Sequence, residues 1–193
     1  VREPALALIG DLQQPLAQVS RHFRADPKKV GGSLFRVLRD TRFEHEGGPY
    51  KPWIGLRFHH ERKRDVHAPG YFVHIAPTEE GSFLGGGLWR PEGPTLNRLR
   101  SFLQDNPVAW QKLETSARLA RYPLDGEMLQ RPPRGVPVDH PLVDALRRKS
   151  FVRSAPLPLA TATSPGLKTA IATMFTDLGP FMDYLCAALD LDF

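Results

Sequence analysis

The stretch WIGLRF, residues 53–58, alternates between side chains that favour burial and side chains that do not. Ile54, Leu56 and Phe58 share one side of an extended chain, because successive residues of a strand point to opposite faces. This alternation predicts a β-strand over Trp53–Phe58 with one face against a core.

Three further segments around this stretch predict strands of the same kind. In YFVHIA, the residues Tyr71, Val73 and Ile75 share one side. Leu34–Phe43 is also rich in strand-forming residues, and SFLGGGLW, residues 82–89, follows the expected turn PTEEG. Because short links join the four segments, we expect an antiparallel four-stranded meander.

Helical periodicity precedes and follows the strands. Before them, apolar residues recur at intervals of three and four, and Pro15 within this pattern predicts a kink or a restart. After Pro94 helical patterns return, and we expect helices over residues 96–105, 108–121 and 141–149, and from Pro165 onward.

Proline and glycine set the expected interruptions in the C-terminal half. We expect a loop over residues 154–166, a break at Gly179-Pro180 and a helix capped by Asp139. The prediction is a single α+β domain over residues 1–193, with the meander flanked by N- and C-terminal helices.

Composition sets the broad class. Of the 193 residues 41% are hydrophobic and 24% charged, which is typical of a globular domain with one core. No apolar run approaches the roughly 20 residues that cross a bilayer, so we expect no membrane partner. A single cysteine, Cys186, excludes an internal disulfide and favours a cytoplasmic location, with the thiol inert in a core helix.

The net charge of +5 favours anionic partners. The basic residues are scattered along the chain instead of forming one long run. We therefore expect a small anionic ligand before nucleic acid, which stays a weaker candidate partner. The sequence gives no indication of the oligomeric state.

The stretch LFRVLRDTRFEHEGGPYK, residues 34–51, is rich in arginine. In a strand, Arg36, Asp40 and Arg42 share one face and Arg39 lies on the other. Guanidinium groups pair with carboxylates through two parallel hydrogen bonds, so one interpretation is a partly buried ion network that only stabilises the sheet.

The other interpretation is a ligand site, because three arginines against one aspartate leave positive charge uncompensated. Guanidinium forks suit a phosphate or a carboxylate, and a histidine nearby can donate a hydrogen bond or a proton. The predicted ligand-binding residues are Arg36, Arg39, Asp40, Arg42, Tyr50, Lys51 and His74.

Arg36, Arg39, Asp40, Arg42 and Tyr50 resemble the arginine-rich signature of a conserved hypothetical family found in bacteria and some fungal multidomain chains, the domain of unknown function 2461. The stretches PYKPWIGLRF, APGYFVHIAP, FLGGGLWRP and PPRGVPVDHPLVDALRRKSF extend the resemblance over nearly the whole chain.

This resemblance implies no activity, because the family has no known function. Family members usually begin some tens of residues earlier with a helical segment, which we expect this chain to lack. Glu46 and Gly47 stand where the family has an aspartate and a lysine, so a mechanism that needs that amine is not implied here.

Other motifs carry less weight. Gly85–Gly87 match neither a P-loop nor a dinucleotide fingerprint, so we expect backbone packing and no cofactor. His59, His60 and His67 fall around an expected polar link, and His59 lies near His74 if their strands pair. Their spacing matches no familiar metal motif, and we expect no metal site.

Three function classes remain open at this point. The first is a protein that binds a small anion, or an enzyme that acts on one. The second is a non-enzymatic interaction module with a purely structural arginine–aspartate network. The third is a nucleic-acid-associated protein. No catalytic residues can be assigned, and the residues leave open whether the protein is an enzyme.

Overall fold

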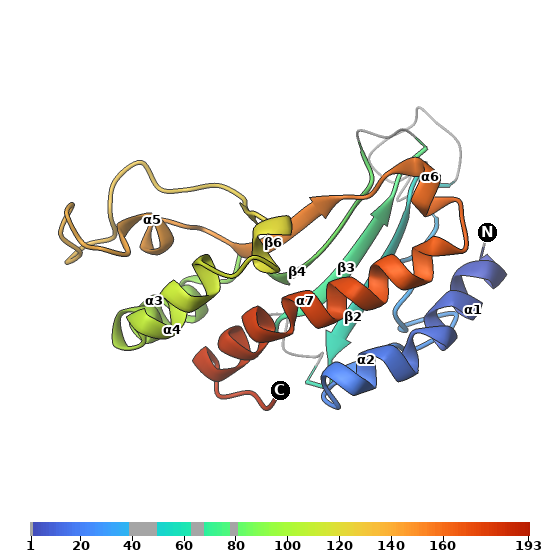
Figure 1. The fold of residues 1–193 in the computed structure, drawn as a ribbon, viewed down its shortest axis with the longest axis horizontal. Coiled ribbons are helices and arrows are strands. Elements are labelled where there is room, and N and C mark those ends of the chain that lie inside the picture. The colour runs from blue at the N-terminus through green and yellow to red at the C-terminus, as the bar shows by residue number, and fades with distance from the viewer. Residues whose placement is uncertain (1, 39–49, 63–67, 78–80) are drawn as a thin grey trace.

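The computed structural model describes residues 2–38, 50–62, 68–77 and 81–193, and its fold is α+β (Figure 1). The helices are α1 Arg2–Asp11, α2 Gln13–Val19, α3 Gly93–Asp105, α4 Pro107–Glu114, α5 Val143–Leu146, α6 Leu159–Ala162 and α7 Gly166–Ala188, with a 3-10 turn, η2, at Leu119–Arg121. The strands are β1 Phe23–Arg24, β2 Ile54–His60, β3 Gly70–Ile75, β4 Phe83–Leu88, β5 Leu124–Asp125 and β6 Phe151–Pro156.

The strands form one antiparallel sheet in the order β1-β2-β3-β4-β6-β5. Its centre, β2-β3-β4, confirms three of the four expected strands and their antiparallel pairing. The remaining expected strand, Leu34–Phe43, is not formed within the described residues 34–38. That segment runs beside β2 through an isolated bridge between Leu34 and Leu56, while β1 pairs with the end of β2.

Strand β6 pairs with the edge of β4 for which the sequence predicted no partner strand. It pairs along the whole of β4, from Phe83 opposite Pro156 to Leu88 opposite Phe151. The expectation of a loop from residue 154 was wrong because Pro156 is the last residue of β6, where a missing amide donor costs little.

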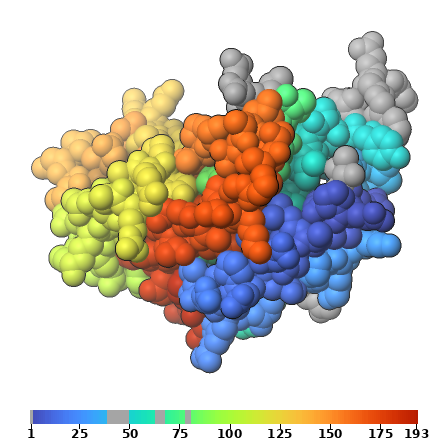
Figure 2. All heavy atoms as spheres, turned by 45° about the vertical axis from the view of Figure 1, so that its right-hand side comes forward, coloured from blue at the N-terminus to red at the C-terminus, as the bar shows by residue number. Residues whose placement is uncertain are grey.

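Helix α7 covers one face of the sheet (Figure 1). The alternation predicted for the central strands is confirmed, since Leu56, Phe58, Tyr71 and Val73 are buried. Phe175 of α7 packs edge-on against Phe58 and Tyr71, at centroid distances of 4.9 and 5.0 Å. Figure 2 shows this helix between the N-terminal helices and the segment that begins with α3.

The expected break at Gly179-Pro180 is absent, since α7 is one helix of 23 residues with Pro180 inside. A proline removes the hydrogen bond to the carbonyl four residues earlier, here that of Thr176. Thr176 and Pro180 are both exposed, so water can bind this carbonyl. No described helix combines the length and apolar character that a bilayer crossing needs.

The N-terminal restart is confirmed: α1 ends at Asp11, and α2 begins at Gln13 with Pro15 in its first turn, where no amide donor is required. Two expectations for later helices were wrong. The helix expected over residues 108–121 ends at Glu114. Asp139 does not cap α5, whose N-cap is Leu142; the Leu142 amide donates instead to His140 Nδ1, at 3.0 Å.

Candidate functional site

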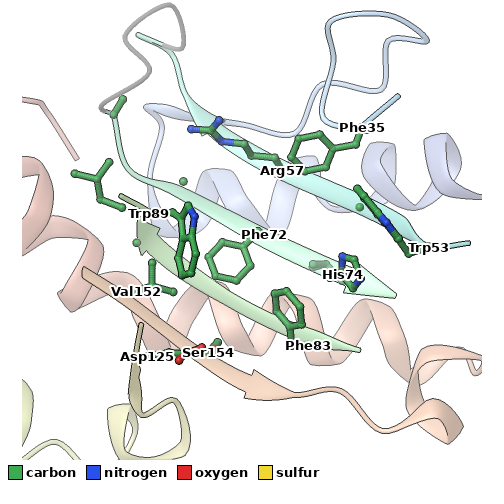
Figure 3. A pocket seen from close by; sticks show the side chains of 16 residues that line it. Phe35, Trp53, Arg57, Phe72, His74, Phe83, Trp89, Asp125, Val152 and Ser154 are labelled. Atoms are coloured by element: carbon green, nitrogen blue, oxygen red, sulfur yellow. Dashed lines mark hydrogen bonds between the residues drawn. The ribbon is translucent and has the colours of Figure 1, made fainter. Parts of the chain in front are cut away.

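The face of the sheet opposite α7 is hollowed into a cavity of about 480 Å³. We call this cavity the aromatic trough (Figure 3). Its polar lining side chains are Arg57 on one side and Asp125 and Ser154 on the other. Its ring-bearing lining residues are Phe35, Trp53, Phe72, His74, Phe83 and Trp89.

A row of rings crosses the sheet at one end of the trough. The His74 ring lies 4.7 Å from that of Trp53 and stacks on Phe83 at 5.0 Å, with 10° between their planes. The register explains the row, because His74 stands opposite Gly55 on β2 and opposite Phe83 on β4. Desolvation lowers the pKa of His74 below its usual 6.5, so this ring is neutral at pH 7.

Glycines keep the trough open. Three large side chains each lie close to a glycine, and a Cβ at that glycine would press on the neighbouring side chain. The glycines and the side chains close to them are Gly55 and Phe35 (2.6 Å from an added Cβ), Gly70 and Arg57 (3.2 Å) and Gly85 and Phe72 (2.9 Å). A Cβ at Gly55 or Gly70 would displace the neighbouring side chain, whereas a Cβ at Gly85 would first collide with the Arg153 carbonyl oxygen in the backbone of β6.

Arg57 is the cation of the trough. No ion pair or side-chain hydrogen bond joins its guanidinium to any other side chain within the described residues. The Arg57 side chain is exposed to solvent, and the neighbouring side chains that partly desolvate it lower its pKa. An arginine nevertheless keeps its charge in proteins, so this group is a charged donor that faces an aromatic cavity.

The opposite wall carries a carboxylate and a hydroxyl. Ser154 Oγ donates to Asp125 Oδ2 at 3.3 Å, and the Gly126 amide donates to Asp125 Oδ1 at 2.6 Å. The turn at Gly126, with φ of 102°, and the pairing of β5 with β6 hold Asp125 at this wall.

The structure brings together two of the predicted site residues. The Lys51 ammonium lies 4.4 Å from the centre of the Trp53 ring, and that ring contacts His74. His74 lies on the strand face opposite Tyr71 and Val73, as the alternation predicts.

Two more predicted site residues, Arg36 and Tyr50, do not line the trough. Arg36 is exposed, so the expectation of a partly buried position was wrong for it. Tyr50 is 64% exposed and is bridged to Leu38. Arg39, Asp40 and Arg42 lie outside the described residues, and their pairing stays a prediction.

Sequence reasoning missed Arg57, although the signal was present. The alternation that buries Leu56 and Phe58 places Arg57 on the other face of a central strand. An arginine on a strand that pairs on both sides has side chains of the neighbouring strands beside it. Asp125 and Ser154 had no such signal, because neither β5 nor β6 was predicted.

The histidines do not meet as expected. His59 stands opposite Gly70 and His74 opposite Gly55, four residues apart along β2, or roughly 13 Å. His60 belongs to the core, with its Nε2 2.9 Å from the Asp192 carbonyl oxygen. Among the described residues, no three His, Cys, Asp or Glu side chains are grouped so that they could hold a metal ion.

Cys186 is fully buried in α7, and burial raises the pKa of its thiol from 9.0 to about 12. We expect a thiol-reactive dye at pH 8 to label the native protein at least tenfold more slowly than the protein in urea. Because the folded thiol holds its proton more tightly, stability should fall as the pH rises from 9 towards 12, relative to a Cys186→Ala variant. Equal labelling rates in both states would contradict the burial.

A model of one protein family matches residues 1–184, and its description is "Conserved hypothetical protein (DUF2461)". No curated protein matches the chain, and no solved structure does.

Proposed function

Because the chain belongs to the DUF2461 family, whose description as a conserved hypothetical protein names no activity, we propose a function from the site itself. The aromatic trough binds a small organic anion that carries a planar ring. The ring stacks on the aromatic side chains, and the acid group, a carboxylate or a phosphate, pairs with Arg57.

One observation carries this proposal: the Arg57 guanidinium has no partner among the described side chains and faces a cavity lined mainly by rings. Arg57 is exposed, so solvent partly screens a pair formed here, but partial desolvation by its neighbours makes the pair stronger than one in open water. A guanidinium offers two parallel N–H groups, which match the two oxygens of a carboxylate or phosphate.

The aromatic rings that line the trough favour a ligand that itself carries a planar ring. His74 already stacks on Phe83 and lies tilted against Trp53, and Trp89, which is 59% exposed, lies at the other end of the trough. An added ring between them would repeat these contacts. The cavity of about 480 Å³ falls within the roughly 300–1,000 Å³ that is typical of small-molecule sites.

A thermal-shift and calorimetric comparison at constant ionic strength tests this function. Phenyl phosphate and benzoate carry both features, benzyl alcohol carries only the ring, and inorganic phosphate and acetate carry only the charge. A ligand at 100 times its Kd stabilises the folded state by about 2.7 kcal/mol, so the ring-bearing acids should raise Tm most. Arg57→Ala should weaken their binding at least tenfold, because a hydrogen bond to a charged group contributes about 1.5–3 kcal/mol.

Arg118→Ala is the matched control, since it removes the same charge from an exposed site that does not line the trough. It should leave the affinities unchanged, and Arg57→Lys should recover only part of the lost affinity. A single-stranded oligonucleotide belongs in the same series, where tighter binding with a steep salt dependence would indicate phosphate-backbone recognition instead. If no ring-bearing acid binds wild type better than Arg57→Ala, the proposal is wrong.

A further inference from the structure

We infer the substrate class from the wall of the trough that carries Asp125 and Ser154. The ring of the ligand carries N–H donors on the side away from its acid group, and Asp125, supported by Ser154, accepts hydrogen bonds from them. The inference rests on the proposed function, because it presupposes that Arg57 binds the acid group. It adds a specificity-determining residue that the anion alone does not require.

The strand register places the two groups at opposite ends of one line. Arg57 stands opposite Phe72, Phe72 opposite Gly85, and Gly85 opposite Ser154. Three inter-strand steps separate the backbones of Arg57 and Ser154, a distance of about 14 Å. Between them lie one aromatic ring and one glycine, so a flat molecule can lie along this line with an end at each wall (Figure 3).

The Asp125 carboxylate has capacity to accept from a ligand. Each of its oxygens accepts one bond, from Ser154 Oγ and from the Gly126 amide, whereas a carboxylate can accept about four. No Lys, Arg or His side chain of the described residues forms an ion pair with it, although Arg148 donates to the Asp125 main-chain carbonyl at 3.5 Å and is close enough for its charge to interact with the carboxylate. Within the part of the chain that the structure describes, the trough thus has a cation without an ion-pair partner on one wall and a carboxylate without one on the other.

These two walls favour a ligand whose two ends differ, with an acid group at one end and hydrogen-bond donors at the other. A ring with an acid at one end and an amino or amide N–H edge at the other satisfies both, and a ring with the acid alone leaves the carboxylate facing an apolar edge. A purine nucleoside monophosphate and an aminobenzoate share this chemistry. They differ in whether the acid is a phosphate on a sugar or a carboxylate on the ring.

Two matched ligand pairs test the inference: guanosine monophosphate against inosine monophosphate, and 4-aminobenzoate against benzoate. Within each pair the members differ by one amino group. In at least one pair, wild type should bind the amino member roughly tenfold tighter, as expected of a hydrogen bond to a charged acceptor. Asp125→Asn, which keeps an oxygen for the Gly126 turn, should remove this preference and leave the affinity for the other member unchanged.

Ser154→Ala is the control for a purely structural effect, because it leaves the carboxylate in place and should keep most of the preference. If wild type binds both members of each pair equally while Arg57→Ala weakens both, the inference is overturned and the proposed function stands. If Arg57→Ala weakens neither pair, both are overturned. Loss of preference in Asp125→Asn with equal loss of affinity for all four compounds also overturns the inference.

Discussion

Replacing Phe175 by alanine is expected to lower the free energy of unfolding by about 4 kcal/mol, in the usual range for a buried phenylalanine. Phe175 is fully buried in α7 and contacts Phe58 of β2 and Tyr71 of β3 through edge-on ring pairs. The substitution leaves a cavity between the helix and the two strands, and a rigid sheet cannot collapse to fill it.

Urea unfolding followed by circular dichroism measures this effect, with Thr173→Ala as the matched control on an exposed position of the same helix. The control should not lower the free energy of unfolding and should raise it by at most about 0.7 kcal/mol, since alanine favours a helix more than threonine does. For a chain of this length the Phe175→Ala loss corresponds to roughly 10 °C in Tm. A loss below about 1 kcal/mol would mean that α7 does not pack on β2 and β3 through this ring.

The central sheet could be predicted because burial and strand period agree there. In β2 and β3 every second residue is apolar, and this pattern alone assigns Leu56, Phe58, Tyr71 and Val73 to the buried face. The edges could not be predicted in the same way. Strand β6 ends in Pro156 within a proline-rich stretch, and it forms because β4 offers a free edge to pair with, which is a long-range property.

The same distinction between local pattern and long-range pairing applies to the residues of the candidate site. Lys51 and His74, two of the predicted residues, both lie against the Trp53 ring. Arg57 was not predicted, because it is a single arginine within an apolar strand and belongs to no cluster of charged residues. Asp125 comes from a two-residue strand whose position depends on β6, so local sequence holds no signal for its place in the trough.

Substituting Gly87 by alanine is expected to lower the free energy of unfolding by about 3 kcal/mol, which combines backbone strain with overpacking. Gly87 has a φ of 138°, a conformation that residues with a Cβ rarely adopt. An added Cβ would also collide with the Phe151 carbonyl oxygen and lie 2.8 Å from the Val152 Cα, both in the backbone of β6. Neither neighbour can turn aside as a side chain would, so β6 must shift.

Gly10→Ala is the matched control, because a Cβ there meets no atom within 4 Å and Gly10 lies inside α1. That variant should gain up to about 1 kcal/mol, since alanine favours a helix more than glycine does. Gly87 and Val152 line the trough. The shift of β6 in Gly87→Ala should therefore also weaken the binding of phenyl phosphate and benzoate. A Gly87→Ala protein as stable as wild type would mean that β4 and β6 do not approach so closely, and the wall that carries Ser154 would then lie farther from Arg57.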